Sequence, residues 1–106
     1  MGDATALELT PAELSFYDGA ARSQVYIAVQ GTIYDVTSGA SFYGPGGPYE
    51  CFGGKECARA LALMKIDVAE CTSDLTGLTP KNLSTLQDWV RKFAAKYPVV
   101  GQLRKQ

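Results

Sequence analysis

The chain has 106 residues, a length that suits one domain built around one hydrophobic core. Its 10 basic and 11 acidic side chains give a formal net charge of −1, which leaves no basic excess for binding nucleic acid. Histidine is absent, which excludes a histidine-activated nucleophile, zinc bound by histidine and haem held between two imidazoles.

The first elements predicted are a short strand and a short helix. Residues 7–9 are expected to form the strand. Thr10 can cap a helix, Pro11 suits its first position, and the glutamate three residues after Thr10 completes a capping box. We expect this helix to end at Asp18 and Gly19, because glycine commonly follows the last helical residue.

A β-hairpin is predicted next. Residues 25–29 and 32–36 are rich in β-branched and aromatic side chains, and they flank a turn at Gln30 and Gly31. The apolar side chains of this hairpin are Ile27, Val29, Ile33 and Tyr34.

Residues 38–54 differ from the rest of the chain because they combine glycine and proline with aromatic side chains. The segment holds six glycines and two prolines, which fix an irregular backbone. Its aromatic residues are Phe42, Tyr43, Tyr49 and Phe52. Loops are usually polar, so we interpret this segment as a wall for a flat, apolar ligand.

Two helices are predicted in the second half of the chain. Residues 57–64 favour a helix, and residues 67–73 are expected to form a polar connection. Thr79 and Pro80 repeat the cap-then-proline start, and the longer helix that follows is expected to stop at Pro98.

The longer helix carries an apolar stripe at helical spacing. Its members are Leu83, Leu86, Val90, Phe93 and Tyr97. Trp89 lies beside the stripe, and we interpret it as a core residue. Residues 99–103 are expected to return as an edge strand of the sheet.

The three cysteines are expected to be free thiols. They are Cys51, Cys57 and Cys71, and their odd number without a visible signal peptide points to a reducing compartment. No apolar run approaches the roughly 18–20 residues that cross a bilayer. We therefore expect a cytoplasmic protein without a transmembrane segment, with peripheral association at endomembranes left open.

Several blocks of the sequence, taken in order, carry a family resemblance. Residues 42–49 read FYGPGGPY, and residues 52–62 follow them. Further blocks lie at residues 9–14, 34–37, 86–89 and 96–101. Together they resemble the membrane-associated progesterone receptor family, a branch of the cytochrome b5-like heme/steroid-binding proteins. The resemblance covers about residues 7–103, with a departure from the family's usual sequence at residues 53–59.

The resemblance implies an α+β fold of the cytochrome b5-like type. A small antiparallel or mixed sheet would be combined with several short helices and one longer C-terminal helix. The whole chain, residues 1–106, is expected to be a single heme/steroid-binding domain with its core at about residues 7–103.

The resemblance also implies the site. Tyr49 would be the axial ligand of haem b, and Tyr43, Lys96 and Tyr97 would line the site and hydrogen-bond the propionates or the ligand oxygen. A phenol has a pKa of about 10 in water, and ferric iron can hold it as phenolate, as in catalase. Packed aromatic roles for the tyrosines, a solvated charge at Lys96 and a competing thiolate at Cys51 remain open.

The resulting functional hypothesis is a non-enzymatic haem-binding module. It would carry haem or regulate partner haem enzymes at membranes, and a haem-dependent homodimer is one expected form. No acid–base pair or nucleophile constellation is readable, so an enzyme is not expected. Two alternatives stay open: a protein that binds a steroid or sterol in the same aromatic cleft, and an interaction scaffold that holds no cofactor.

Overall fold

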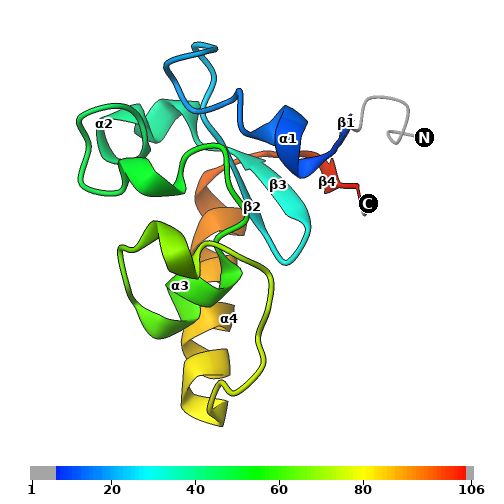
Figure 1. Cartoon of the computed structure of the whole chain (residues 1–106), viewed down its shortest axis with the longest axis vertical. Helices are drawn as coiled ribbons and strands as arrows, with labels where there is room; N and C mark the ends of the chain where they lie inside the picture. Colours follow the sequence, from blue (N-terminus) through cyan, green and yellow to red (C-terminus); the bar gives the residue numbers. More distant parts are fainter. Residues whose placement is uncertain (1–6, 105–106) are drawn as a thin grey trace.

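The computed structural model describes residues 7–104 (Figure 1). A four-stranded sheet has the order β1-β4-β3-β2. Its strands are β1 (Leu7–Leu9), β2 (Tyr26–Val29), β3 (Thr32–Asp35) and β4 (Val99–Leu103). β1 and β4 run parallel, whereas the β2–β3 and β3–β4 pairs are antiparallel. The sheet is therefore mixed, and it joins the two ends of the described chain.

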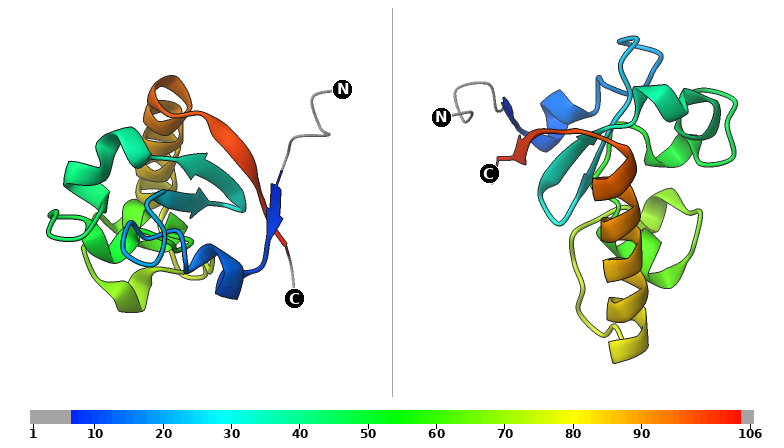
Figure 2. Two further views of the ribbon diagram at one scale, coloured as in Figure 1. Left: turned by 90° about the horizontal axis from the view of Figure 1, so that it is seen from above. Right: turned by 180° about the vertical axis from the view of Figure 1, so that it is seen from behind.

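The helices lie beside and below this sheet. They are α1 (Pro11–Leu14), α2 (Ala40–Tyr43), α3 (Ala58–Leu63) and α4 (Pro80–Lys96). Short 3-10 turns are η2 (Thr37–Gly39), η3 (Glu50–Phe52) and η4 (Val68–Glu70). Figures 1 and 2 show α3 and α4 packed side by side, with α4 reaching well past the sheet. Within residues 7–104, no helix is both long and apolar enough to cross a bilayer.

The predicted start of α1 is confirmed, but its predicted end is wrong. The Glu13 N–H donates to Thr10 Oγ1 at 3.1 Å, and the Thr10 N–H donates to Glu13 Oε1 at 2.8 Å, so the capping box forms. The helix ends at Leu14 rather than at Asp18. The Asp18 carboxylate instead accepts hydrogen bonds from the N–H groups two and three residues later, which favours a turn.

The predicted hairpin is confirmed as β2 and β3. Gln30 and Gly31 both have positive φ, 52° and 84°, as the tight turn between two twisted strands requires. The Glu56 carboxylate accepts the N–H of Gly31 at 2.7 Å and that of Ala58 at 2.8 Å. This side chain ties the hairpin turn to the start of α3, and its burial raises the pKa of Glu56.

β4 is an internal strand, so the prediction of an edge strand is wrong. β3 pairs with one side of β4, and β1 covers the other side, with Leu7 opposite Gly101 and Leu9 opposite Leu103. The edges of the sheet are β1 and β2. Pairing between segments at opposite ends of a chain depends on tertiary packing, which a local pattern does not encode.

The predicted start of α4 is confirmed and gains a second cap contact. The Asn82 N–H donates to Thr79 Oγ1, and the Thr79 N–H donates to Asn82 Oδ1, both at 3.1 Å. Pro98 follows the end of the helix, as expected. Both ends of α4 are therefore fixed by residues that the sequence singles out.

The apolar stripe of α4 is buried only in part. Leu86, Phe93 and Tyr97 are buried and Val90 is half-buried. Leu83 is exposed, which contradicts its place in the predicted stripe. It lies in the first turn of α4, at the end of the helix that is farthest from the sheet (Figure 2).

The sheet separates two clusters of buried side chains. Along β2, Ile27 and Val29 belong to the larger cluster, and Tyr26 and Ala28 belong to the smaller one, as the alternation of a strand requires. The larger cluster also takes in side chains from α2, α3 and α4. The aromatic segment of residues 38–54 packs against this larger cluster, so the candidate site lies on that face.

Candidate functional site

The aromatic segment combines short helical turns with the irregular backbone expected, which lies between α2 and η3. η2, α2 and η3 follow one another, and the Tyr49 N–H donates to the Phe42 carbonyl oxygen at 2.8 Å. This bond closes the loop that presents Tyr49. Gly47 allows the closure, because a Cβ at this position would lie 2.5 Å from the same carbonyl oxygen.

Tyr49 stands in the middle of a row of stacked rings. Its ring centroid lies 5.7 Å from that of Tyr43 and 5.7 Å from that of Phe52. Tyr43 in turn contacts Phe93 at 6.0 Å and Tyr97 at 6.3 Å. Aromatic contacts at these distances stabilise particular ring orientations. The two tyrosines of the loop are thus anchored to the C-terminal end of α4.

Tyr43 is buried within the row. Its burial, reinforced by the neighbouring Tyr97 and Tyr49 hydroxyls, raises the pKa of Tyr43 to about 12. The Tyr43 phenol therefore stays protonated at neutral pH and can act as a hydrogen-bond donor.

Lys96 and Tyr97 lie together at the C-terminal end of α4. The Lys96 Nζ atom is 5.5 Å from the Tyr97 ring centroid and 5.9 Å from that of Phe42. Tyr97 is buried, and its hydroxyl fills a space that Gly39 leaves open: a Cβ on Gly39 would lie 2.5 Å from the hydroxyl oxygen. The structure thus brings Tyr43, Tyr49, Lys96 and Tyr97 into one neighbourhood.

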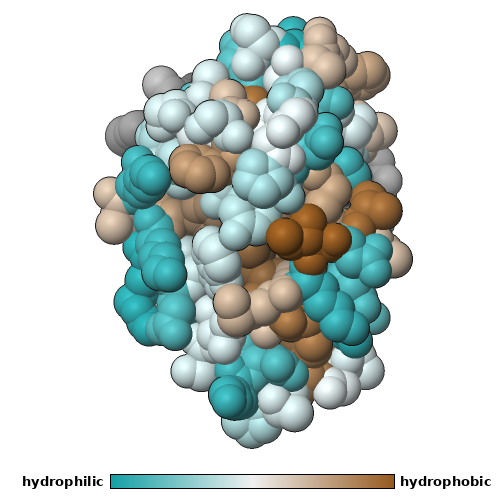
Figure 3. Space-filling view, turned by 90° about the vertical axis from the view of Figure 1, so that its left-hand side faces the viewer, coloured by the Kyte–Doolittle hydropathy of each residue, from teal (hydrophilic) through white to brown (hydrophobic). Residues whose placement is uncertain are grey.

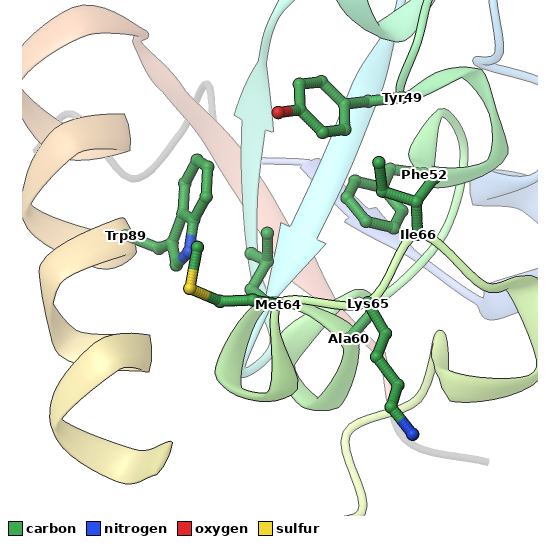
Figure 4. Close-up of a pocket in the computed structure, with 8 residues that line it drawn as sticks. Tyr49, Phe52, Ala60, Met64, Lys65, Ile66 and Trp89 are labelled. Atoms are coloured by element: carbon green, nitrogen blue, oxygen red, sulfur yellow. The ribbon is translucent and has the colours of Figure 1, made fainter. Parts of the chain in front are cut away.

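An open pocket adjoins Tyr49, with a volume of about 320 Å³ that includes the open space at its mouth. Its lining comes from η3, α3, the segment after α3, and α4: Tyr49, Phe52, Ala60, Leu61, Met64, Lys65, Ile66 and Trp89. Figure 4 shows the Tyr49 hydroxyl pointing toward the side where Trp89 stands, while the Lys65 amine points away. The pocket is therefore apolar, with one phenol oxygen at its border.

Of the four predicted site residues, Tyr49 alone lines this pocket. Tyr43 and Tyr97 lie behind it in the aromatic row, and Lys96 lies at the edge of that row. Cys51 does not line it either; it packs against the larger core cluster.

Sequence reasoning missed most of the opposite wall. Trp89, expected in the core, is half-buried and faces the pocket. Met64 and Ile66 follow α3 in an exposed segment, where no periodicity marks them. The sequence carries no signal for Met64, because its positive φ of 54° at the C-cap of α3 is visible only in the structure.

Apolar side chains are exposed around the mouth of the pocket. Met64 is 70% exposed and Ile66 57%. Figure 3 shows brown, apolar side chains grouped on this face among teal, polar ones. A surface of this kind is typical of a site covered by a ligand or a partner.

The site offers few side-chain atoms that could bind a metal ion. Among residues 7–104, no group of three or more cysteine, aspartate or glutamate side chains is arranged to hold a metal ion. In the same part of the chain, no hydrogen bond reaches the Tyr49 hydroxyl, and no buried side-chain oxygen is left unpaired. The Tyr49 oxygen is therefore open to solvent and free to meet a ligand at the pocket.

Comparison with known proteins relates this site to a family. Residues 10–104 match the family described as cytochrome b5-like heme/steroid binding domain. Probable steroid-binding protein 3 of Arabidopsis thaliana is 47% identical over 98 residues, covering 92% of this chain and 98% of that protein. The cytochrome P450 regulator dap1 of Schizosaccharomyces pombe is 41% identical, covering 91% of this chain and 62% of that protein.

A solved structure from Arabidopsis thaliana, described as having a cytochrome b5 like fold, has a TM-score of 0.86 at 44% identity, covering 95% of this chain and 94% of that one. The predicted α+β fold, with its small mixed sheet and longer C-terminal helix, is thus confirmed. Membrane-associated progesterone receptor component 2 of Rattus norvegicus is 38% identical, and the chain spans 44% of its length. The chain belongs to the cytochrome b5-like heme/steroid-binding domain family, in its membrane-associated progesterone receptor branch.

Proposed function

We propose that this protein is a non-enzymatic haem-binding module in which the Tyr49 phenolate is the axial ligand of ferric haem b. The observation that carries the proposal is the placement of the Tyr49 hydroxyl: it is stacked on both sides, lacks a hydrogen-bond partner within residues 7–104, and borders an open apolar pocket. A hard anionic oxygen suits ferric iron, and tyrosinate ligation of haem is established chemistry.

The neighbouring side chains support the same proposal. The protonated Tyr43 phenol stacks beside Tyr49, and a hydrogen bond donated from it in the haem complex would favour the anionic form of the ligand. Lys96 is exposed beside Tyr97 and offers a positive charge to a propionate. Trp89 and Met64 offer an apolar surface opposite Tyr49 to a flat macrocycle.

The ligand chemistry favours a carrier or regulator over an electron shuttle. Phenolate stabilises the ferric state, so reduction would weaken the protein–iron bond instead of leaving it unchanged. The family relative named a cytochrome P450 regulator supports a partner of the haem-enzyme class. The exposed apolar side chains around the pocket support contact with such a partner, or between two haem-loaded copies of this chain.

A steroid or sterol is the second candidate ligand, because family relatives are named steroid-binding proteins. Titration of the purified protein with hemin, and separately with progesterone, distinguishes the two. Hemin is expected to bind with one-to-one stoichiometry and to develop a visible ferric spectrum, while progesterone neither saturates the protein nor displaces hemin. Saturable progesterone binding with no hemin spectrum would replace the proposal by the steroid function. Binding of neither would leave only an interaction scaffold.

A further inference from the structure

Three thiols lie near one another, and the sulfur atoms of two of them are in contact. Cys51, Cys57 and Cys71 are all free, and the Cys57 and Cys71 sulfur atoms lie 3.8 Å apart. Cys57 is fully buried, with its sulfur 3.4 Å from the Phe52 carbonyl oxygen. The Cys71 sulfur also lies 3.8 Å from the Cys51 carbonyl oxygen. The contact joins residue 57, at the start of α3, to residue 71, just after η4.

One thiol of the pair can be reached from solvent. Cys71 is half-buried and lines a surface hollow of about 590 Å³, measured with its open mouth, together with Lys55 and Thr72. A hydrogen bond from Cys57 and the positive charge of Lys55 lower the pKa of Cys71. Burial raises the pKa of Cys57. The two thiols therefore differ in reactivity. Cys71 is the accessible nucleophile, and the buried Cys57 thiol is in direct contact with it.

We propose that Cys57 and Cys71 form a peroxide-responsive thiol pair that closes to an intramolecular disulfide. The Cys71 thiolate attacks one oxygen of hydrogen peroxide, the O–O bond breaks, and the leaving hydroxide takes up a proton as water. The Cys57 sulfur then attacks the Cys71 sulfenic acid, the S–O bond breaks, and a second water leaves with the Cys57 proton. Two thiols are oxidised by two electrons in total, and one peroxide is reduced to two waters.

The geometry makes this closure a local event. A disulfide needs its sulfurs at about 2.05 Å, so the pair must approach from 3.8 Å. Both neighbours of Cys71 are half-buried, so a shift of its segment displaces no fully buried neighbour in the chain. The ring closed by the disulfide spans residues 57–71 and includes Met64, Lys65 and Ile66, which line the pocket beside Tyr49. Oxidation would therefore tether the segment that forms one wall of the site.

Trypsin separates the three cysteines, which makes the test direct. Cys51 falls in the peptide of residues 23–55, Cys57 in residues 56–59 and Cys71 in residues 66–81. The reduced full-length protein is treated with hydrogen peroxide, its remaining thiols are alkylated, and the digest is analysed by mass spectrometry. The expected product is one disulfide between peptides 56–59 and 66–81, with alkylated Cys51.

Two variants control the experiment. Cys51→Ser should form the same disulfide at the same rate, because its thiol is not required. Cys71→Ser should lose the disulfide and leave Cys57 unoxidised, with an unchanged circular dichroism spectrum showing that the fold persists. A disulfide from Cys71 to Cys51, a cross-linked dimer, or sulfinic acid on Cys71 beside a free Cys57 would each overturn the proposal.

Discussion

Gly39 packs closely against Tyr97, a member of the aromatic row. The Tyr97 hydroxyl occupies the position next to the Gly39 Cα where a side chain would otherwise stand. Such a contact couples the two residues, so that the effect of changing one depends on the identity of the other. This pair offers a test of the site's packing that does not touch Tyr49.

Gly39→Ala should destabilise the protein by about 1–3 kcal/mol, as overpacking of a buried contact does, and should weaken hemin binding by displacing Tyr97. The double variant Gly39→Ala with Tyr97→Phe should recover most of the stability, because the new Cβ then meets a ring carbon at 3.3 Å instead of the hydroxyl oxygen at 2.5 Å. Urea unfolding of Gly39→Ala, Tyr97→Phe and the double variant measures this. If the losses of unfolding free energy in the two single variants simply added in the double variant, the close packing of Gly39 against Tyr97 would be contradicted.

The raised pKa of Tyr43 predicts that the protein loses unfolding free energy at alkaline pH. Its pKa is raised from 10.0 to about 12 in the folded protein, so between these values the folded state keeps a proton that the unfolded state loses. The stability linked to Tyr43 is therefore complete below pH 10 and falls as the pH rises toward 12. Tyr43→Phe should show a shallower decline over this range in urea unfolding. Burial also raises the pKa of Tyr26 and Tyr34, and these residues act equally in both proteins.

At the residue scale, prediction from the sequence succeeded where a residue type is unusual in its surroundings. The loop tyrosines were singled out because aromatic groups are unusual in a glycine-rich segment, and the structure stacks Tyr43 and Tyr49 together. Met64 and Ile66 could not be singled out, because an apolar residue in a connecting segment has no periodic pattern. Their role depends on where the segment after α3 lies relative to α4. The ligand role of Tyr49 itself stays a prediction.

At the scale of elements, the Arg59 side chain ties α3 to the segment between α3 and α4. The Arg59 Nε donates to Glu70 at 3.0 Å, and the same guanidinium donates to the carbonyl oxygens of Asp74 at 3.0 Å and Thr76 at 2.8 Å. The planar guanidinium suits this role, because several donors in a fixed plane can bridge groups from three residues.

Arg59→Ala should therefore cost about 2 kcal/mol of unfolding free energy, a typical value for losing charge-assisted hydrogen bonds in a half-buried place. Arg59→Lys keeps the charge but loses the planar donor set, so it should recover less than half of that loss. Urea unfolding at neutral pH measures both. Equal stability of the lysine variant and the wild type would show that charge alone matters.

Element boundaries followed the sequence wherever a cap defines them. Thr10 and Thr79 start α1 and α4 as predicted, because a side-chain oxygen satisfies backbone N–H groups locally. The end of α1 and the position of β4 within the sheet were predicted wrongly. Both depend on contacts made elsewhere: a turn built on Asp18 and a parallel partner at the opposite end of the chain.

At the scale of the whole molecule, the site lies between two parts of the fold. The loop from α2 to η3 packs on the sheet side and carries Tyr49, while α3 and α4 supply the opposite wall (Figures 1 and 4). The larger core cluster joins both parts. Because the pocket remains open to solvent, a ligand bound there could leave without unfolding the core.

This arrangement predicts redox-dependent retention of haem. If phenolate is the axial donor, reduction to Fe(II) removes most of the preference for it. Hemin affinity should then fall at least about tenfold, or about 1.4 kcal/mol, when the complex is reduced with dithionite. Transfer of haem to apomyoglobin before and after reduction measures the change. Equal transfer rates in the two states would instead indicate a ligand set suited to electron transfer.

Whether the Tyr49 oxygen binds the iron is decided by the visible absorption spectrum of the hemin-loaded Tyr49→Phe protein. Tyr17→Phe is the matched control, because Tyr17 stacks on Tyr26 away from the pocket, with ring centroids 4.4 Å apart. The phenolate-to-iron charge-transfer band of the wild type should persist in Tyr17→Phe and disappear in Tyr49→Phe. An unchanged band in Tyr49→Phe would show that the Tyr49 oxygen does not bind the iron.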